Sequence, residues 1–109
     1  MGKYELTGEV LELVAQRFRA LAVPARLQVL AALRKGEMTV SELVSETGLG
    51  QANLSKHLQI LYNLGFVARR KTGLFVHYTL SDRRVFQLCE IACDRIEGEA
   101  KSRWRLLAS

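Results

Sequence analysis

The sequence predicts one mainly α-helical domain that carries a small β-hairpin. Apolar residues recur at helical spacing through most of the 109 residues. Within residues 39–65 a short segment containing glycine separates two helical patterns, and residues 66–80 are rich in branched and aromatic side chains. A helix, a tight turn, a second helix and a hairpin in this order are typical of a winged helix-turn-helix domain. We therefore expect residues 1–109 to form a single domain of this kind.

The composition is that of a globular chain, and its net charge indicates the kind of partner that the protein binds. Hydrophobic residues make up 49% of the sequence and charged residues 25%, so the chain can bury a core. The formal net charge of +5 favours a polyanionic partner. No apolar run is long enough to span a bilayer, and the N-terminus has no long apolar segment, so we expect a cytoplasmic protein without a membrane partner. Two cysteines do not make the disulfide framework of a small secreted domain.

Helical patterns at both ends of the chain have more apolar surface than one small domain needs. Residues 8–21 form the first such pattern, and Pro24 begins the next helix, which runs to Arg34 and is apolar on most sides. Ser81 is expected to cap a last helix over residues 81–104, which has a broad apolar stripe. We expect the helices at 8–21 and 81–104 to form the interface of a homodimer. The alternative is that both pack within one monomer.

The helix-turn-helix is predicted at residues 39–65. Thr39 can cap its first helix, because Glu42 three residues later can complete a capping box. Gly48 is expected to end that helix in the left-handed conformation. The second helix should run from Gln51 to Asn63, with three leucines turned to the core: Leu54, Leu58 and Leu61.

The exposed side of that second helix has the chemistry of a surface that contacts DNA. It combines small, amide and hydroxyl side chains with one lysine: Ala52, Lys56, Gln59 and Asn63, flanked by Asn53 and Ser55. Such residues can enter a major groove without repelling phosphate, and amides can read base edges. No Asp or Glu lies between Glu46 and Asp82. Because an ordinary solvated surface, the alternative, mixes charges of both signs, the pattern favours double-stranded DNA as the partner.

Residues 66–80 predict the wing. The two strands are expected at Val67–Lys71 and Leu74–Leu80, joined by a bend at Lys71-Thr72-Gly73. Alternation turns one set of side chains inward, namely Leu74, Val76, Tyr78 and Leu80. The cations near the tip are Arg69, Arg70 and Lys71, which we expect to contact phosphate or the minor groove. The alternative is that they only protect a sheet edge from aggregation.

Two stretches resemble a known family. The run LAVPARLQVLAAL and the run LSKHLQIL, followed by LGFV and the wing, are similar to the ArsR/SmtB family of small bacterial winged-helix repressors. The resemblance implies homodimers built from the first and last helices, binding of an operator by the second helix of the motif, and release when an effector binds. By position it assigns the groove contacts to Gln51, Ala52, Asn53, Ser55, Lys56 and Gln59. It assigns the wing to Arg69, Arg70, Lys71 and Gly73.

The positions at which many members of that family hold metals are altered in this chain. The Cys-x-Cys site of the family falls on Thr39-Val40-Ser41, which supplies no thiolate. The site on the last helix falls on Asp82-Arg83-Arg84, with its second half at Arg95 and Gly98. Arginine remains protonated and does not bind metals. We therefore expect that neither metal site of the family is present in this chain and that the protein requires no cofactor.

Cys89 and Cys93 are the remaining candidates for an effector site. They lie four residues apart and share one face of the last helix. Thiolates bind thiophilic metals and take part in redox exchange, so the pair is a candidate thiol sensor. The alternative is that both are small core hydrophobes, since free cysteine is among the most buried residue types.

Together these patterns predict a sequence-specific transcriptional regulator, and the resemblance implies a homodimeric repressor that an effector releases from a palindromic operator. No nucleophile–base pair, phosphate-binding loop or hydrolase motif is present in the sequence, so we do not expect an enzyme. The alternative is a structural or chromosome-associated winged-helix protein that binds DNA without sensing an effector. A marked preference for one operator over bulk DNA would distinguish the regulator from the structural protein.

Overall fold

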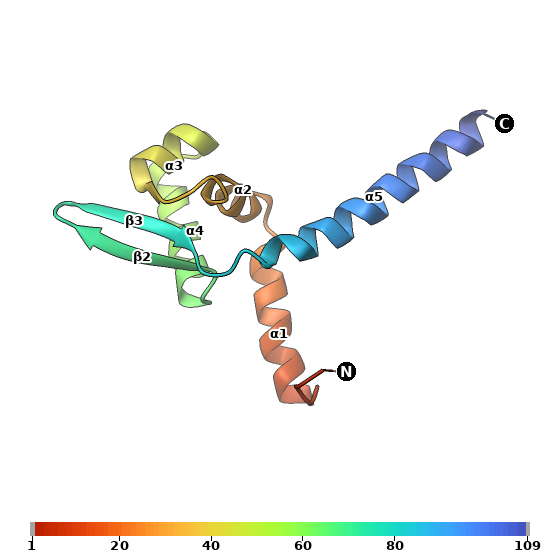
Figure 1. Ribbon diagram of the computed structural model, residues 1–109, viewed down its shortest axis with the longest axis horizontal. Coiled ribbons are helices and arrows are strands. Elements are labelled where there is room, and N and C mark those ends of the chain that lie inside the picture. Colours follow the sequence, from red (N-terminus) through yellow and green to blue (C-terminus); the bar gives the residue numbers. More distant parts are fainter. Residues whose placement is uncertain (1, 109) are drawn as a thin grey trace.

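The computed structural model describes residues 2–108, and its elements follow the predicted order with one added strand. Figure 1 shows a long hairpin beside a group of central helices, from which the first and last helices project in different directions. The elements are α1 (Gly8–Leu21), α2 (Pro24–Leu33), β1 (Met38–Thr39), α3 (Val40–Thr47), α4 (Gln51–Asn63), β2 (Val67–Thr72), β3 (Phe75–Leu80) and α5 (Val85–Ala108). The predicted winged helix-turn-helix fold is confirmed.

The core lies where α2, α3, α4 and the sheet meet. The three leucines predicted to turn inward from α4, Leu54, Leu58 and Leu61, are each 0% exposed. They pack in one cluster with apolar side chains of α2, α3 and the sheet, among them Val29, Leu30, Leu33, Leu43 and Tyr78. As expected for a central helix, α2 contributes most of its apolar side chains to this cluster.

Local signals determine where the helix-turn-helix begins and ends. The backbone N–H of Glu42 donates to Thr39 Oγ1 at 3.2 Å, and the N–H of Thr39 donates to Glu42 Oε1 at 3.1 Å. This is the predicted capping box, and its hydrogen bonds hold the pKa of Glu42 below its ordinary value. Gly48 ends α3 with a φ of 73°, a conformation that glycine adopts without steric cost.

The sheet differs from the prediction in two ways. Its strand order is β1-β3-β2, and the added strand β1 pairs Met38 with Tyr78. The hairpin bend is one residue later than predicted, because Thr72 pairs with Phe75 and leaves Gly73 and Leu74 as the loop. Leu74 was expected to face inward, but its position in the loop leaves it 96% exposed. Gly73 has a φ of 60°, and the two-residue loops favoured in β-hairpins require a positive φ at their first position.

The start of the last helix was predicted wrongly. Ser81 does not cap α5, which begins at Val85 and continues to Ala108, past the predicted end at residue 104. The side chain of Asp82 instead accepts a hydrogen bond from the backbone N–H of Arg84 at 2.8 Å and pairs with the guanidinium of Arg84. These contacts lower the pKa of Asp82 to about 2 and stabilise a turn before the helix.

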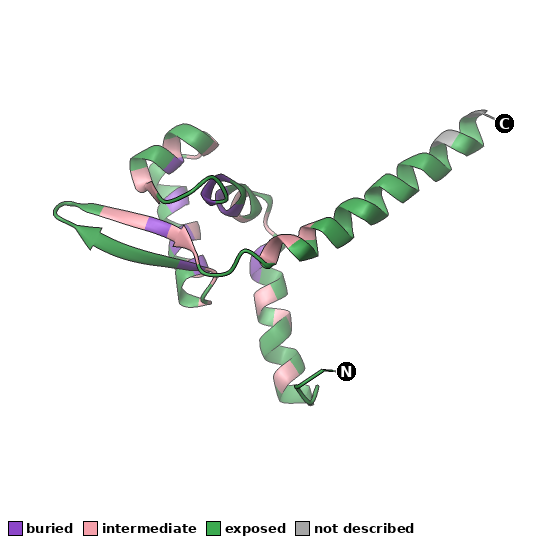
Figure 2. Ribbon diagram, in the orientation of Figure 1, coloured by how far each residue is buried: buried purple, intermediate pink, exposed green. Residues whose placement is uncertain are grey.

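Most of α1 and α5 is exposed along its length, as Figure 2 shows. On α1 the exposed fractions of Leu11, Leu13 and Phe18 are 49%, 52% and 53%, and on α5 Ile91 and Ile96 are each 62% exposed. The alternative of packing within one monomer therefore does not hold for these faces, which are available to a second subunit. Among the described residues, no helix has the length and apolar character needed to cross a membrane.

Candidate nucleic-acid interface

The side of α4 opposite the core presents every groove residue that the sequence assigned to this helix. The side chains of Gln51, Ala52, Asn53, Ser55, Lys56 and Gln59 are all exposed. Gly50 precedes the helix without a side-chain cap, and the first turn contains no acidic residue. The first N–H groups of α4 and its positive dipole end are thus open to an anion such as phosphate.

His57 belongs to the inner side of α4 and connects this helix to α1 and α2. Its Nδ1 accepts a hydrogen bond from Arg26 Nε at 3.1 Å, while Arg26 Nη1 donates to the carbonyl oxygen of Ala20 at 3.2 Å. Within the described residues, the imidazole thus bonds to the Arg26 side chain and not to the backbone. Burial, together with the positive charge of Arg26, lowers the pKa of His57. The imidazole is therefore held neutral between α4 and the end of α1.

Arg69 joins the base of the wing to α4. Its guanidinium carbon lies 3.8 Å from the ring centroid of Tyr62, a cation–π contact. Its Nη1 donates to Gln59 Oε1 at 3.5 Å, and Gln59 Nε2 in turn donates to Asn63 Oδ1 at 2.8 Å. A hydrogen bond with Tyr78 is the main cause that raises the pKa of Arg69 above its ordinary value. Gln59 and Arg69, which the sequence assigned to DNA contact, are thus also in contact with each other.

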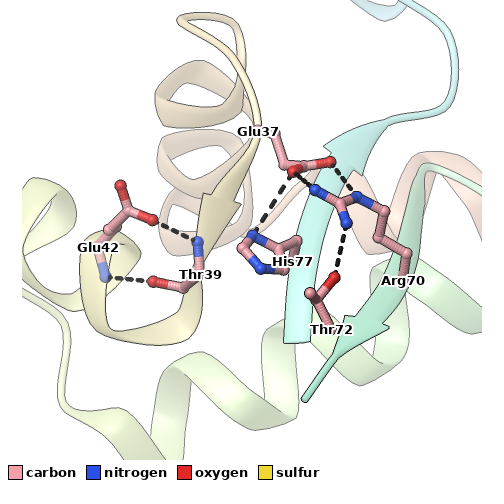
Figure 3. Close-up of polar contacts among 6 residues, drawn as sticks. All are labelled: Glu37, Thr39, Glu42, Arg70, Thr72 and His77. Atoms are coloured by element: carbon pink, nitrogen blue, oxygen red, sulfur yellow. Dashed lines mark hydrogen bonds and ion pairs between the residues drawn. The ribbon is translucent and has the colours of Figure 1, made fainter. Parts of the chain in front are cut away.

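Strand alternation distributes the three wing cations over both faces of the hairpin. Arg69 pairs with the buried Tyr78 and Lys71 pairs with Val76, so both lie on the face toward α4. Arg70 pairs with His77 and lies on the opposite face, where Glu37 binds its guanidinium (Figure 3). Within residues 2–108, neither Lys56 nor Lys71 has an ion-pair partner, so their charges are open to phosphate.

Glu37 is the residue of this region that sequence reasoning missed. It lies 33 positions before Arg70 in the chain, outside the segment without carboxylates. Its only local signal is its place between Gly36 and the capping residue Thr39. Pairing of β1 with β3 brings the side chain of Glu37 within reach of Arg70 across β3, and β1 was not predicted.

The two cysteines lie outside the core of the described chain. Cys89 is half-buried, Cys93 is exposed, and both thiols are free. They border a surface hollow near the end of α2 that is also lined by Arg34, Arg83 and Phe86. Within residues 2–108, no group of three or more His, Cys, Asp or Glu side chains is arranged to hold a metal ion.

Known proteins share this sequence pattern and architecture. The family described as "Bacterial regulatory protein, arsR family" matches residues 23–69, which include α2, the helix-turn-helix and the first part of the wing. A "Probable mercury resistance operon repressor" of Streptomyces lividans is 36% identical over an alignment of 102 residues, which covers 82% of this chain and 82% of that protein. The chain belongs to the ArsR family. It is thus a DNA-binding transcriptional repressor and not an enzyme, as predicted.

Two further regulatory proteins are similar to this chain. The regulator NmtR of Mycobacterium tuberculosis is 39% identical over 79 residues, which are 72% of this chain and 66% of that protein. A homodimeric winged helix-turn-helix DNA-binding domain from Mycobacterium bovis has a TM-score of 0.74 at 30% identity, covering 90% of this chain and 94% of that one. The predicted homodimer is confirmed by the likeness to this homodimeric structure.

The His57–Arg26 contact predicts a loss of stability in mild acid. Because folding lowers the pKa of His57 below 6.5, the unfolded chain binds a proton more readily and stability falls as pH decreases through that value. We expect the urea midpoint to fall between about pH 8 and about pH 5.5, above the range in which carboxylates titrate. His57→Gln keeps an acceptor for Arg26 but does not titrate, so its midpoint should fall less. An equal fall in both proteins would contradict this account.

Proposed function

We propose that the homodimer of this ArsR-family chain binds a palindromic operator, with α4 of each subunit in the major groove and the wing against the DNA backbone. The observation that supports this most directly is the exposed face of α4, which carries Lys56 and amide side chains and no carboxylate. Lys71 extends the positive surface onto the wing, on the face turned toward α4. Phosphate contacts would position the dimer, and the amides of Gln51 and Asn53 would read base edges.

The second subunit determines the form of the operator. The exposed apolar faces of α1 and α5 supply material for a two-fold interface, and the relative from Mycobacterium bovis is a homodimer. A two-fold dimer presents two identical α4 helices, so its site should be an inverted repeat. The two half-sites should be separated by about one turn of DNA, roughly 10 base pairs, or a multiple of it.

Selection of bound duplexes from a random library by the purified protein tests this proposal and distinguishes it from a chromosome-associated role. We expect an inverted repeat to be recovered and to bind at least about a thousandfold more tightly than a scrambled duplex at physiological salt. Recovery of no consensus, with equal binding to all duplexes, would instead support the structural role.

Two lysines are expected to contact phosphate. Lys56→Ala on α4 and Lys71→Ala on the wing should each weaken binding to the selected operator and to scrambled DNA alike. Each should also reduce the slope of log K against log salt concentration by about 0.9, because one fewer counterion is released. Lys35→Ala is the matched control, since Lys35 lies outside the expected dimer helices and the assigned DNA contacts and pairs with Glu46. An unchanged slope in either variant would remove that lysine from the interface.

We also propose that Cys89 and Cys93 respond to the effector. Both thiols lie outside the core, and they are one helical turn apart on α5, a helix expected at the dimer interface. A relative from Streptomyces lividans is named for mercury resistance, and mercury is a thiophilic metal of the kind that thiolates bind. Because one chain offers only these two sulfurs in this region, a thiophilic metal would bind best between the cysteine pairs of both subunits.

Replacing both cysteines by serine tests this sensor. Cys89→Ser with Cys93→Ser should leave operator affinity and the urea midpoint unchanged, because neither side chain is in the core. Addition of Hg²⁺ or of a thiol-reactive disulfide should release the parent protein from operator DNA and leave the variant bound. If the variant loses stability but is still released, the cysteines are packing residues and the effector acts elsewhere.

A further inference from the structure

One row of polar side chains crosses the outer face of the sheet, away from the core. Arg70 of β2 pairs with His77 of β3, and His77 pairs with Thr39 of β1. Tyr78, the next residue along β3, is 7% exposed and belongs to the core. Because successive side chains of a strand point to opposite faces, the row that contains Arg70 lies on the face opposite Tyr78 and α4.

Glu37 binds the guanidinium of Arg70 through both carboxylate oxygens (Figure 3). Arg70 Nε donates to Oε2 at 2.9 Å and Nη2 donates to Oε1 at 2.5 Å, while Nη1 donates to Thr72 Oγ1 at 2.7 Å. His77 Nδ1 lies 3.5 Å from Glu37 Oε1. Every nitrogen of the Arg70 guanidinium thus has a protein acceptor, and paired donation to a carboxylate is the strongest geometry for such a contact.

The Glu37–Arg70 pair joins the segment before β1 to strand β2, and β1 and β2 are not hydrogen-bonded neighbours in the sheet. Glu37 precedes β1 and the capping residue Thr39, so it belongs to the segment that leads into α3. Arg70 lies on β2, which is separated from β1 by β3. The pair therefore connects the outer strand of the wing directly to the start of the helix-turn-helix.

The same contacts argue against a phosphate as the partner of Arg70. To reach DNA, the guanidinium would have to give up both bonds to Glu37 and leave an ionised carboxylate close to the phosphates. Arg70 holds the pKa of Glu37 below its ordinary value, so that carboxylate stays charged at neutral pH. As a pair, Glu37 and Arg70 carry no net charge, so they would release few counterions on binding.

We propose that Glu37 and Arg70 are positioning residues for operator binding: they hold the wing at a fixed angle to α4, and Arg70 does not itself contact phosphate. This inference rests on the proposed use of the wing in DNA binding. Lys71, on the other face, then supplies the wing's phosphate contact. The position of the wing would thus depend on a carboxylate that lies outside the segment that touches DNA.

A double-mutant cycle on the selected operator duplex tests the pair. We expect Glu37→Gln and Arg70→Gln each to weaken operator binding roughly threefold, the size expected for losing one exposed ion pair. The double variant should bind no more weakly than either single variant, because both changes remove the same interaction. The salt slope should stay within about 0.3 of the parent value in all three, well below the change expected for a lost phosphate contact.

Several outcomes would contradict the positioning role of Glu37 and Arg70, and the measurements distinguish them. If Arg70 contacts phosphate, Arg70→Gln lowers the salt slope by about 0.9 and Glu37→Gln tightens binding by releasing the guanidinium. Additive losses, or full affinity in both single variants, would also overturn the proposal. Urea midpoints and far-UV circular dichroism show whether each variant is folded under the binding conditions. A loss of operator affinity matched by an equal loss of folded protein would reduce the pair to a stabilising contact and overturn its positioning role.

The lysine variants keep this test separate from the proposed function. If Lys56→Ala and Lys71→Ala reduce the slope but the Glu37–Arg70 cycle is additive, only the positioning role fails. If the two lysine variants also bind DNA with an unchanged slope, the proposed placement of α4 and the wing on DNA fails as well.

Discussion

Burial of Leu54, Leu58 and Leu61 determines which side chains of α4 face solvent. Each buried leucine contributes about 1.5–3 kcal/mol relative to an exposed one, whereas an exposed ion pair contributes at most about 1 kcal/mol. No arrangement of surface charges can therefore rotate α4 away from the core. Because the three leucines share one side, Lys56 and the amide side chains are held on the other. The proposed contact surface is in this sense a consequence of the core.

The wing shows that adjacent cations can have different roles. Arg69 packs on Tyr62 and contacts Gln59, so it links the hairpin to the exposed face of α4. Arg70 points to the other face and is neutralised by Glu37, whereas Lys71 has its charge open to solvent. A count of positive residues in the segment would treat all three alike. Their different partners support separate proposed roles for them, in attachment, in orientation and in contact with phosphate.

Contacts within the chain also join α1, a helix expected at the dimer interface, to α4. Arg26 donates hydrogen bonds to the carbonyl of Ala20 at the end of α1 and to His57 on α4, the helix proposed to read DNA. The cysteines lie on α5, whose first turns border α1 and α2 in the apolar hollow lined by Phe18, Leu27 and Cys89. In an effector-released repressor, the proposed sensor and the DNA-contacting surface would be coupled through these shared neighbours.

The sequence by itself determined the fold class, the helix-turn-helix bounds and the exposed face of α4, because capping residues, glycines and apolar periodicity act over only a few positions. Strand β1, the start of α5 at Val85 and the exposed loop position of Leu74 required the tertiary structure. So did the partners of Arg70 and His57, which come from residues 33 and 31 positions away in the chain. Such contacts leave no periodic signal, since they exist only once strands and helices far apart in the sequence have packed together.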